Sequence, residues 1–144
     1  MTTTSTRTEL APRLRLSVMR LARRLRQEAE HDVTPSMLSA LSTIERLGPV
    51  TLGRLAELER VRPPTITRIV ARLEDDGLVA RSIDQSDHRV VRVRLSRRGR
   101  SLVQRARGRK DAFLADKLRA LSSEDLAALE RAVEVVDGLL EERP

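Results

Sequence analysis

The chain has 144 residues, of which 40% are hydrophobic and 34% charged, a balance typical of a folded, soluble domain. It contains no cysteine and only two histidines, which excludes disulfides and thiol-based redox sensing and argues against a metal site. The net charge of +7 is concentrated in residues 46–110, which carry 17 basic against seven acidic side chains, so a polyanionic partner is expected. No apolar run is long enough to span a membrane and no signal-peptide core is present, so we expect a cytoplasmic protein without a membrane partner.

Apolar periodicity predicts four helices before the pattern changes at Gly77. A stripe of apolar residues indicates a first helix that ends near His31. Thr34 and Thr51 have side chains that commonly cap the second and third helices. Pro63-Pro64 cannot lie inside a helix but can open one, so the fourth helix starts there and Gly77 is its left-handed cap. The four helices are predicted over approximately residues 10–31, 35–47, 52–58 and 63–76.

A β-hairpin is predicted after Gly77. The runs 78–83 and 90–95 are rich in β-formers and flank a turn-rich tip at residues 84–88. In the second run, apolar residues alternate with two arginines, which is the pattern of a half-buried strand: Val91, Val93 and Leu95.

Two more helices are predicted after the hairpin. Ser96 caps a fifth helix that reaches about Ala120, and Gly99 in its first turn is interpreted as a mild weakness. Ser122 opens a sixth helix with a capping pattern. Its apolar residues form a seam typical of a helix that packs on another helix: Leu126, Leu129, Val133, Val136 and Leu140.

The fourth helix carries the candidate DNA-reading face. Its apolar residues define a buried side, and Pro64, Arg68, Ala71, Arg72 and Asp75 project from the opposite side. Small residues let such a helix enter a major groove of ~12 Å, and Arg68 is the best candidate for a bidentate contact with guanine. The flanking Thr65 and Thr67 could bond phosphate or touch a thymine methyl. An ordinary amphipathic helix with solvated arginines would give the same pattern.

The hairpin strengthens the DNA-binding interpretation because arginines gather on it and just beyond it: Arg81, Arg89, Arg92, Arg94, Arg97, Arg98 and Arg100. Arg89, at the tip, could enter the minor groove, with the Asp87 carboxylate orienting its guanidinium. Alternatively, Asp84, Asp87 and Arg89 only stabilise the turn. A mixed role is favoured, since orienting an arginine also fixes the turn. The candidate DNA contacts are Pro64, Thr65, Thr67, Arg68, Arg72, Asp87, Arg89 and Arg92.

The run from Pro64 to Arg81, then Asp84, Asp87-His88-Arg89 and the stretch from Val93 to Gly99, resembles the MarR (multiple antibiotic resistance regulator) family. The resemblance covers the order of elements along essentially the whole chain. It departs at Pro63-Pro64, where many members have small polar residues, so this end of the helix is expected to meet DNA differently. The family members that sense peroxide through cysteine cannot be the model, because this chain has no cysteine.

The order of the predicted elements, four helices, a hairpin and two helices, indicates a mainly α fold with a small β-hairpin wing, a winged helix-turn-helix. The resemblance implies the same fold with N- and C-terminal dimerisation helices. After a disordered tail at 1–7, a single domain would cover 8–144. Its dimerisation helices would lie at about 8–30 and 110–144, and the DNA-binding lobe at about 34–100. It further implies a homodimer that represses from a near-palindromic operator on double-stranded DNA and is released by a small-molecule effector. Aromatic acids are one possible effector class, although the chain offers few aromatic side chains.

The residues themselves also favour a dimer, because the apolar seams of the first and sixth helices are long for one small domain to bury alone. Packing of those two helices within one chain is the alternative. A winged-helix protein–protein adaptor is the second functional hypothesis, and the arginine-rich hairpin argues against it. An enzyme is disfavoured because no nucleophile–base pair, metal spacing or phosphate loop is found, and no cofactor is expected.

Overall fold

The computed structural model describes residues 6–29 and 33–141. His31 and most of the predicted tail at 1–7 lie outside these residues. The chain divides into one unit up to Lys110 and a second from Asp111 onward. The elements are α1 (Arg7–Ala29), α2 (Pro35–Leu47), β1 (Val50–Thr51), α3 (Leu52–Glu59), α4 (Pro63–Asp75), β2 (Val79–Ile83), β3 (Val91–Leu95), α5 (Arg97–Leu118) and α6 (Ser123–Leu140).

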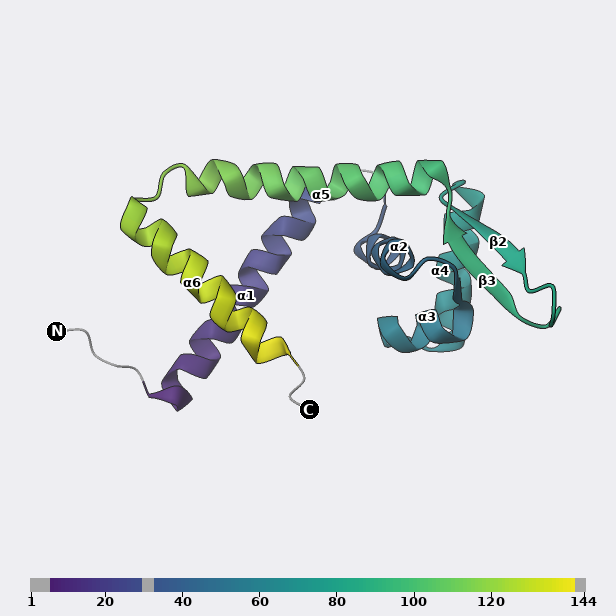
Figure 1. Cartoon of the computed structure of the whole chain (residues 1–144), viewed down its shortest axis with the longest axis horizontal. Helices are drawn as coiled ribbons and strands as arrows, with labels where there is room; N and C mark the ends of the chain where they lie inside the picture. Colours follow the sequence, from purple (N-terminus) through teal and green to yellow (C-terminus); the bar gives the residue numbers. More distant parts are fainter. Residues whose placement is uncertain (1–5, 30–32, 142–144) are drawn as a thin grey trace. The chain divides into compact units, whose positions relative to one another are not determined.

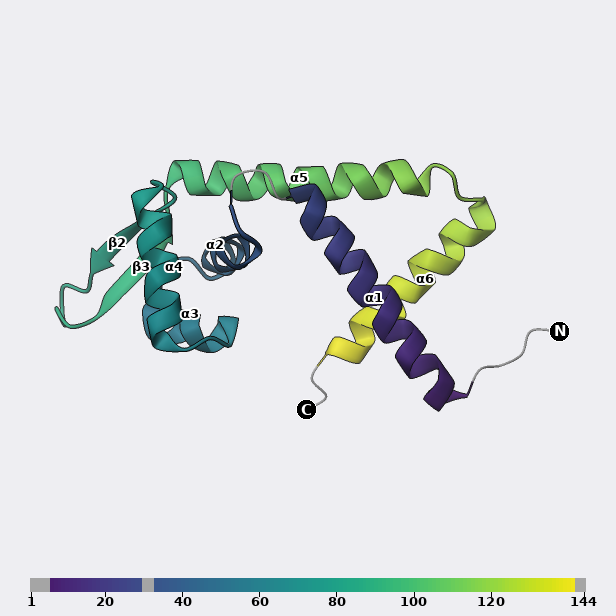
Figure 2. The same ribbon diagram turned by 180° about the vertical axis from the view of Figure 1, so that it is seen from behind.

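The predicted hairpin is present, and β1 adds a strand that was not predicted. The sheet has the order β1-β3-β2 with antiparallel neighbours, and Val50 pairs with Val93 while Ile83 pairs with Val91. Figures 1 and 2 show the β2–β3 hairpin projecting beyond the neighbouring helices. β1 therefore covers the inner edge of β3 and joins the wing to the start of α3.

An aliphatic core holds α2, α3, α4 and the sheet together, as expected of a chain with one aromatic residue. Its largest fully buried side chains come from α2, α3, α4 and β3, and from Leu78 just before β2: Leu41, Ile44, Leu55, Ile66, Val70, Leu73, Leu78 and Val93. Burying each one stabilises the fold by roughly 1.5–3 kcal/mol before entropy is counted. The core thereby fixes the orientation in which α4 presents its opposite side to solvent.

One carboxylate ties α2 to α3. Glu59 accepts hydrogen bonds from the hydroxyls of Ser39 (2.6 Å) and Thr43 (2.5 Å), which lie one helical turn apart on α2. Thr43 is buried, so its hydroxyl needs this partner. The contact was not predicted, because its partners are far apart in the sequence.

The turn between α3 and α4 uses a left-handed residue that is not glycine. Arg60 has φ 54° and ψ 45°, and its N–H donates to the carbonyls at the end of α3. The conformation costs on the order of 1 kcal/mol for a residue with a Cβ. Gly77 has φ 72°, as predicted, although α4 ends at Asp75 with Asp76 as its cap.

Gly99 is more than the mild weakness that was predicted. A Cβ at this position would lie 2.0 Å from the carbonyl oxygen of Leu78, so the first turn of α5 packs directly against backbone. Ser96 completes the junction, because its N–H donates to the Leu78 carbonyl (3.0 Å) and its hydroxyl to the Gly77 carbonyl (2.6 Å). The Gly99 N–H in turn donates to the Ser96 hydroxyl, which confirms Ser96 as the cap of α5.

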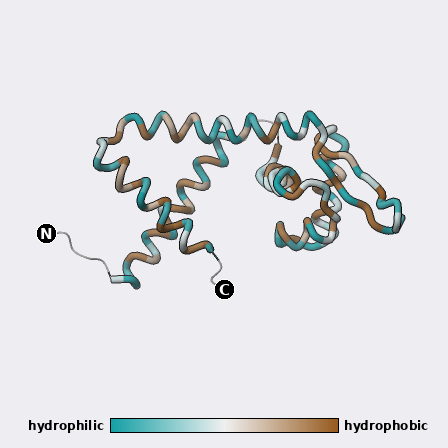
Figure 3. The backbone as a smooth tube through the Cα atoms, viewed as in Figure 1, coloured by the Kyte–Doolittle hydropathy of each residue, from teal (hydrophilic) through white to brown (hydrophobic). Residues whose placement is uncertain are grey.

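The apolar residues of α1 and of α6 recur along each helix (Figure 3). Along α1, Ala29 is the only buried residue, and α6 has no buried residue. Ser122 caps α6 as predicted, by accepting a hydrogen bond from the Asp125 N–H. None of the helices in the described part of the chain is both long and apolar enough to cross a membrane.

Candidate DNA-binding surface

α4 buries one side and exposes the side that was predicted to read DNA. Ile66, Val70 and Leu73 are buried. The exposed residues of the opposite side are Asp75 and four of the five contacts predicted on this helix: Pro64, Thr67, Arg68 and Arg72. Thr65 and Ala71 are half-buried at its borders. The packing therefore leaves a narrow solvent-facing strip that a major groove can accept.

Some arginines of this surface form ion pairs with carboxylates, and Arg68 does not within the described residues. Arg72 lies 3.4 Å from Asp76, and Arg81 of β2 lies 2.8 Å from Glu74 of α4. Arg68 makes no hydrogen bond or ion pair within the described residues. Its five N–H donors are therefore available for a partner outside the chain.

Asp84 organises the tip of the hairpin. One of its carboxylate oxygens accepts from the Ser86 hydroxyl (2.6 Å), the Ser86 N–H (2.8 Å) and the Asp87 N–H (3.0 Å). The other accepts from Arg92 of β3 at 2.6 Å. The Ser86 hydroxyl and the Arg92 guanidinium together hold the pKa of Asp84 well below its ordinary value. Arg92 is thus engaged in bracing the wing, and its predicted contact with DNA stays a prediction.

Asp87 orients Arg89 as predicted. The Asp87 carboxylate receives the Arg89 Nε–H at 3.1 Å and a second, longer contact from Nη2 at 3.4 Å. The Arg89 side chain is 92% exposed, while Asp87 is less than half exposed. The Arg89 guanidinium and its N–H lower the pKa of Asp87, so the pair stays ionised at neutral pH. The result is a guanidinium held at the tip with most of its surface free.

A hollow of about 470 Å³ separates the start of α3 from the hairpin. Two arginines border it, Arg81 and Arg89, together with Thr51, Leu52, Gly53, Val90 and Val91. The outer part of the hairpin therefore leaves a hollow beside the start of α3, with Arg81 and Arg89 at its border.

We expect Asp84→Ala to loosen the wing while Asp84→Asn keeps most of its turn, because asparagine can still accept from the Ser86 and Asp87 N–H groups. Hydrogen exchange of amides 84–90 should accelerate strongly in the alanine variant and only slightly in the asparagine variant.

Because the pKa of Asp84 is lowered in the folded chain, the contribution of its carboxylate to stability is complete above the ordinary value of 3.8 and is lost as pH falls below it. In a His88→Gln variant, wing amide shifts that change between pH 7 and pH 5 would contradict this assignment.

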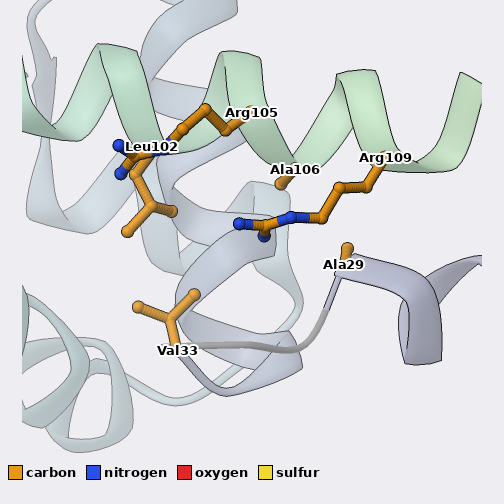
Figure 4. Close-up of a pocket in the computed structure, with 6 residues that line it drawn as sticks. All are labelled: Ala29, Val33, Leu102, Arg105, Ala106 and Arg109. Carbon is orange, nitrogen blue, oxygen red and sulfur yellow. The ribbon is translucent and has the colours of Figure 1, made fainter. Parts of the chain in front are cut away.

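A different pair of pockets lies where the end of α1, α2 and α5 meet. Figure 4 shows the smaller one, of about 10 Å³, along which Arg105 and Arg109 of α5 extend while Ala29 and Val33 face them. It has room for about one water molecule. The larger one, of about 290 Å³, is bordered by two cations, Arg26 and Lys110, and by Val33, Pro35, Leu38, Ser39 and Ser42.

Sequence reasoning found the arginines but missed their partners. The Arg81–Glu74 and Arg92–Asp84 pairs join residues seven and eight positions apart through the sheet and the turn, which no helical or alternating pattern reveals. No group of three or more metal-ligating side chains occurs within residues 6–29 and 33–141.

Comparison with known proteins places these features in a family. The model of the MarR family matches residues 33–91. An HTH-type transcriptional regulator of Mycobacterium leprae is 42% identical over 136 residues, which cover 94% of this chain and 95% of that relative. A MarR family protein from Bacillus stearothermophilus has a TM-score of 0.81 at 29% identity, covering 97% of this chain and 100% of that one. A mutant of S. aureus MepR bound to an oligodeoxyribonucleotide shares the fold, with a TM-score of 0.71 at 19% identity, covering 92% of this chain and 98% of that one.

Proposed function

Because the chain belongs to the MarR family of DNA-binding, HTH-type transcriptional regulators, we propose that it is a homodimeric repressor of a near-palindromic operator, released by a small-molecule effector. Each protomer reads one half-site, with Arg68 at base edges in the major groove and Arg89 in the adjacent minor groove. The observation that carries this proposal is the exposed, unpaired Arg68 on a strip of small side chains beside the wing. The DNA-bound S. aureus MepR mutant supports it by analogy of fold.

The exposed apolar residues of the terminal helices support the homodimer. On α1, Leu10 is 50% and Met19 59% exposed, and on α6, Leu139 is 68% and Leu140 77% exposed. Apolar residues of this kind are typical of a surface that a second copy of the chain covers. A two-fold dimer would also set two copies of α4 about one DNA turn apart, ~34 Å.

The pocket of about 290 Å³ supports the effector. Its apolar lining residues, Val33, Pro35 and Leu38, face the same space as the cations Arg26 and Lys110. Such a lining suits a small organic anion with an apolar body. Since α2 lines the pocket and also packs on α3 and α4, a ligand there can bias the position of the reading helix.

Selection of bound duplexes from a random pool tests the proposed function. The selected site should be an inverted repeat, and its affinity should fall steeply with salt. Placed in a promoter, it should lower transcription when the protein is present, and benzoate as a probe anion should weaken the complex. An adaptor without specific DNA binding would select no repeat, and an increase in transcription would overturn repression.

Leu129→Glu is expected to separate the dimer, because it places a charge on the exposed apolar seam of α6, where Leu129 is 42% exposed. Sedimentation should then give half the native mass, and operator affinity should drop at least tenfold because each half-site is bound alone. Leu47→Glu is the matched control, since Leu47 is 47% exposed on α2 and lies outside both seams. If the Leu129→Glu variant keeps the native mass in sedimentation, α6 is not part of the dimer interface.

A further inference from the structure

The first turn of α4 has no free backbone donor. Pro63 and Pro64 occupy its first two positions and lack N–H groups. The next two N–H groups, of Thr65 and Ile66, both donate to the Arg62 carbonyl, at 2.9 and 3.2 Å. The N-terminus of a helix usually offers such donors to a phosphate, and this one offers none.

The Thr67 hydroxyl is also engaged. It donates to the Pro63 carbonyl one turn earlier, at 2.9 Å. A phosphate oxygen can only accept hydrogen bonds, so Thr67 cannot bond phosphate without breaking this contact. Since the hydroxyl occupies one staggered position on Cβ, the γ-methyl occupies another and is the part of the side chain without a polar partner.

These residues form one of two adjacent ridges on the exposed strip. Residues four apart lie one above the other on a helix, so Pro63, Thr67 and Ala71 make an apolar ridge. Pro64, Arg68 and Arg72 make the neighbouring ridge, which is basic from its second turn onward. The half-buried Thr65 lies on the far flank, beyond the basic ridge, and its hydroxyl is the remaining donor of the first turn.

We infer that the apolar ridge reads a thymine through its 5-methyl group, at a base step next to the base that Arg68 contacts. This inference rests on the proposed DNA binding and adds a specificity element to it. The thymine methyl is the one apolar group on the major-groove edges of the bases, and an apolar ridge without donors complements it. Phosphate, guanine and the adenine N7 all present hydrogen-bond acceptors at this position, and the ridge has no donor for any of them.

Deoxyuridine substitution tests the inference, because it removes only the methyl group of thymine. In the selected operator, each thymine is replaced in turn and the dissociation constant is measured. One position per half-site should lose affinity about fourfold, the value of one buried methyl group, and replacement in both half-sites should lose about fifteenfold. Thymines outside the half-sites serve as the internal control.

Two variants of Thr67 separate its methyl from its hydroxyl. Thr67→Val keeps a methyl and removes the hydroxyl, and it should retain both the affinity and the sensitivity to deoxyuridine. Thr67→Ser keeps the hydroxyl and its bond to Pro63 but removes the methyl in both protomers, so it should bind the thymine operator about fifteenfold more weakly and lose that sensitivity. Thr65→Val, on the far flank, should leave the sensitivity unchanged, and circular dichroism checks that each variant is folded.

The outcomes separate the two proposals. If no duplex is selected, DNA reading itself is overturned. If an operator is selected but no thymine position responds to deoxyuridine, or if Thr67→Val is the weaker variant, the thymine contact is overturned while the proposed function stands.

Discussion

Gly99→Ala should lower the free energy of unfolding by about 3 kcal/mol or more, the largest effect that we expect from adding one methyl group. The added Cβ would lie 2.0 Å from the Leu78 carbonyl oxygen and 3.0 Å from its carbon, and a backbone group cannot turn aside as a side chain can. The displacement would also disturb the Ser96 cap. Thermal unfolding at fixed protein concentration should show a midpoint lowered by roughly 10 °C.

Gly108→Ala is the matched control, since it lies on the same helix and its Cβ would meet nothing within 4 Å. Alanine favours a helix over glycine by about 0.8–1 kcal/mol, so this variant should be as stable as the native chain or slightly more stable. Equal midpoints for the two variants would show that α5 does not depend on its approach to Leu78.

Arg68→Ala should weaken operator binding by about 1–3 kcal/mol per half-site, or roughly fivefold to 150-fold for each half-site. Because Arg68 has no partner within the described residues, its removal leaves no carboxylate unpaired and the loss reports on DNA alone. Competition among duplexes that differ at one position per half-site should show that the preference at that position has disappeared. Arg68→Lys should rescue little, because an ammonium cannot reproduce a bidentate contact.

Arg119→Ala is the charge-matched control for Arg68, since it removes one exposed cation beyond α5 and should change neither affinity nor preference. Arg89→Ala should differ from both. It should weaken binding to all sequences alike and reduce the slope of log affinity against log salt by about one per half-site. If Arg89→Ala loses base preference and Arg68→Ala does not, then the wing reads the bases and α4 makes the contact that does not depend on sequence.

Local chemistry explains most of what could be predicted from the sequence. Prolines at 63 and 64, the left-handed Gly77 and the caps Ser96 and Ser122 each act within a few residues, so the boundaries of α4 and α5 and the start of α6 were found to within two residues. The Asp87–Arg89 pair is local in the same sense. The fold class followed from the order of these elements.

Contacts between distant residues could not be predicted in this way. β1 has two residues, too few to show an alternating pattern, and it is a strand because β3 lies beside it. The bonds of Glu59 to α2 and the approach of Gly99 to Leu78 depend on the packed core. The engagement of Arg92 by Asp84 likewise arises when the turn brings the two strands together.

The backbone of Leu78 connects α4, the wing and α5. Its N–H donates to the Leu73 carbonyl of α4, its carbonyl accepts from Ser96, and Gly99 packs against the same carbonyl while β2 begins at the next residue. α4, the base of the wing and the first turn of α5 are therefore joined directly at one residue. We expect a rotation of the first turns of α5 to carry α4 and the base of the wing with it, because Leu78 links all three.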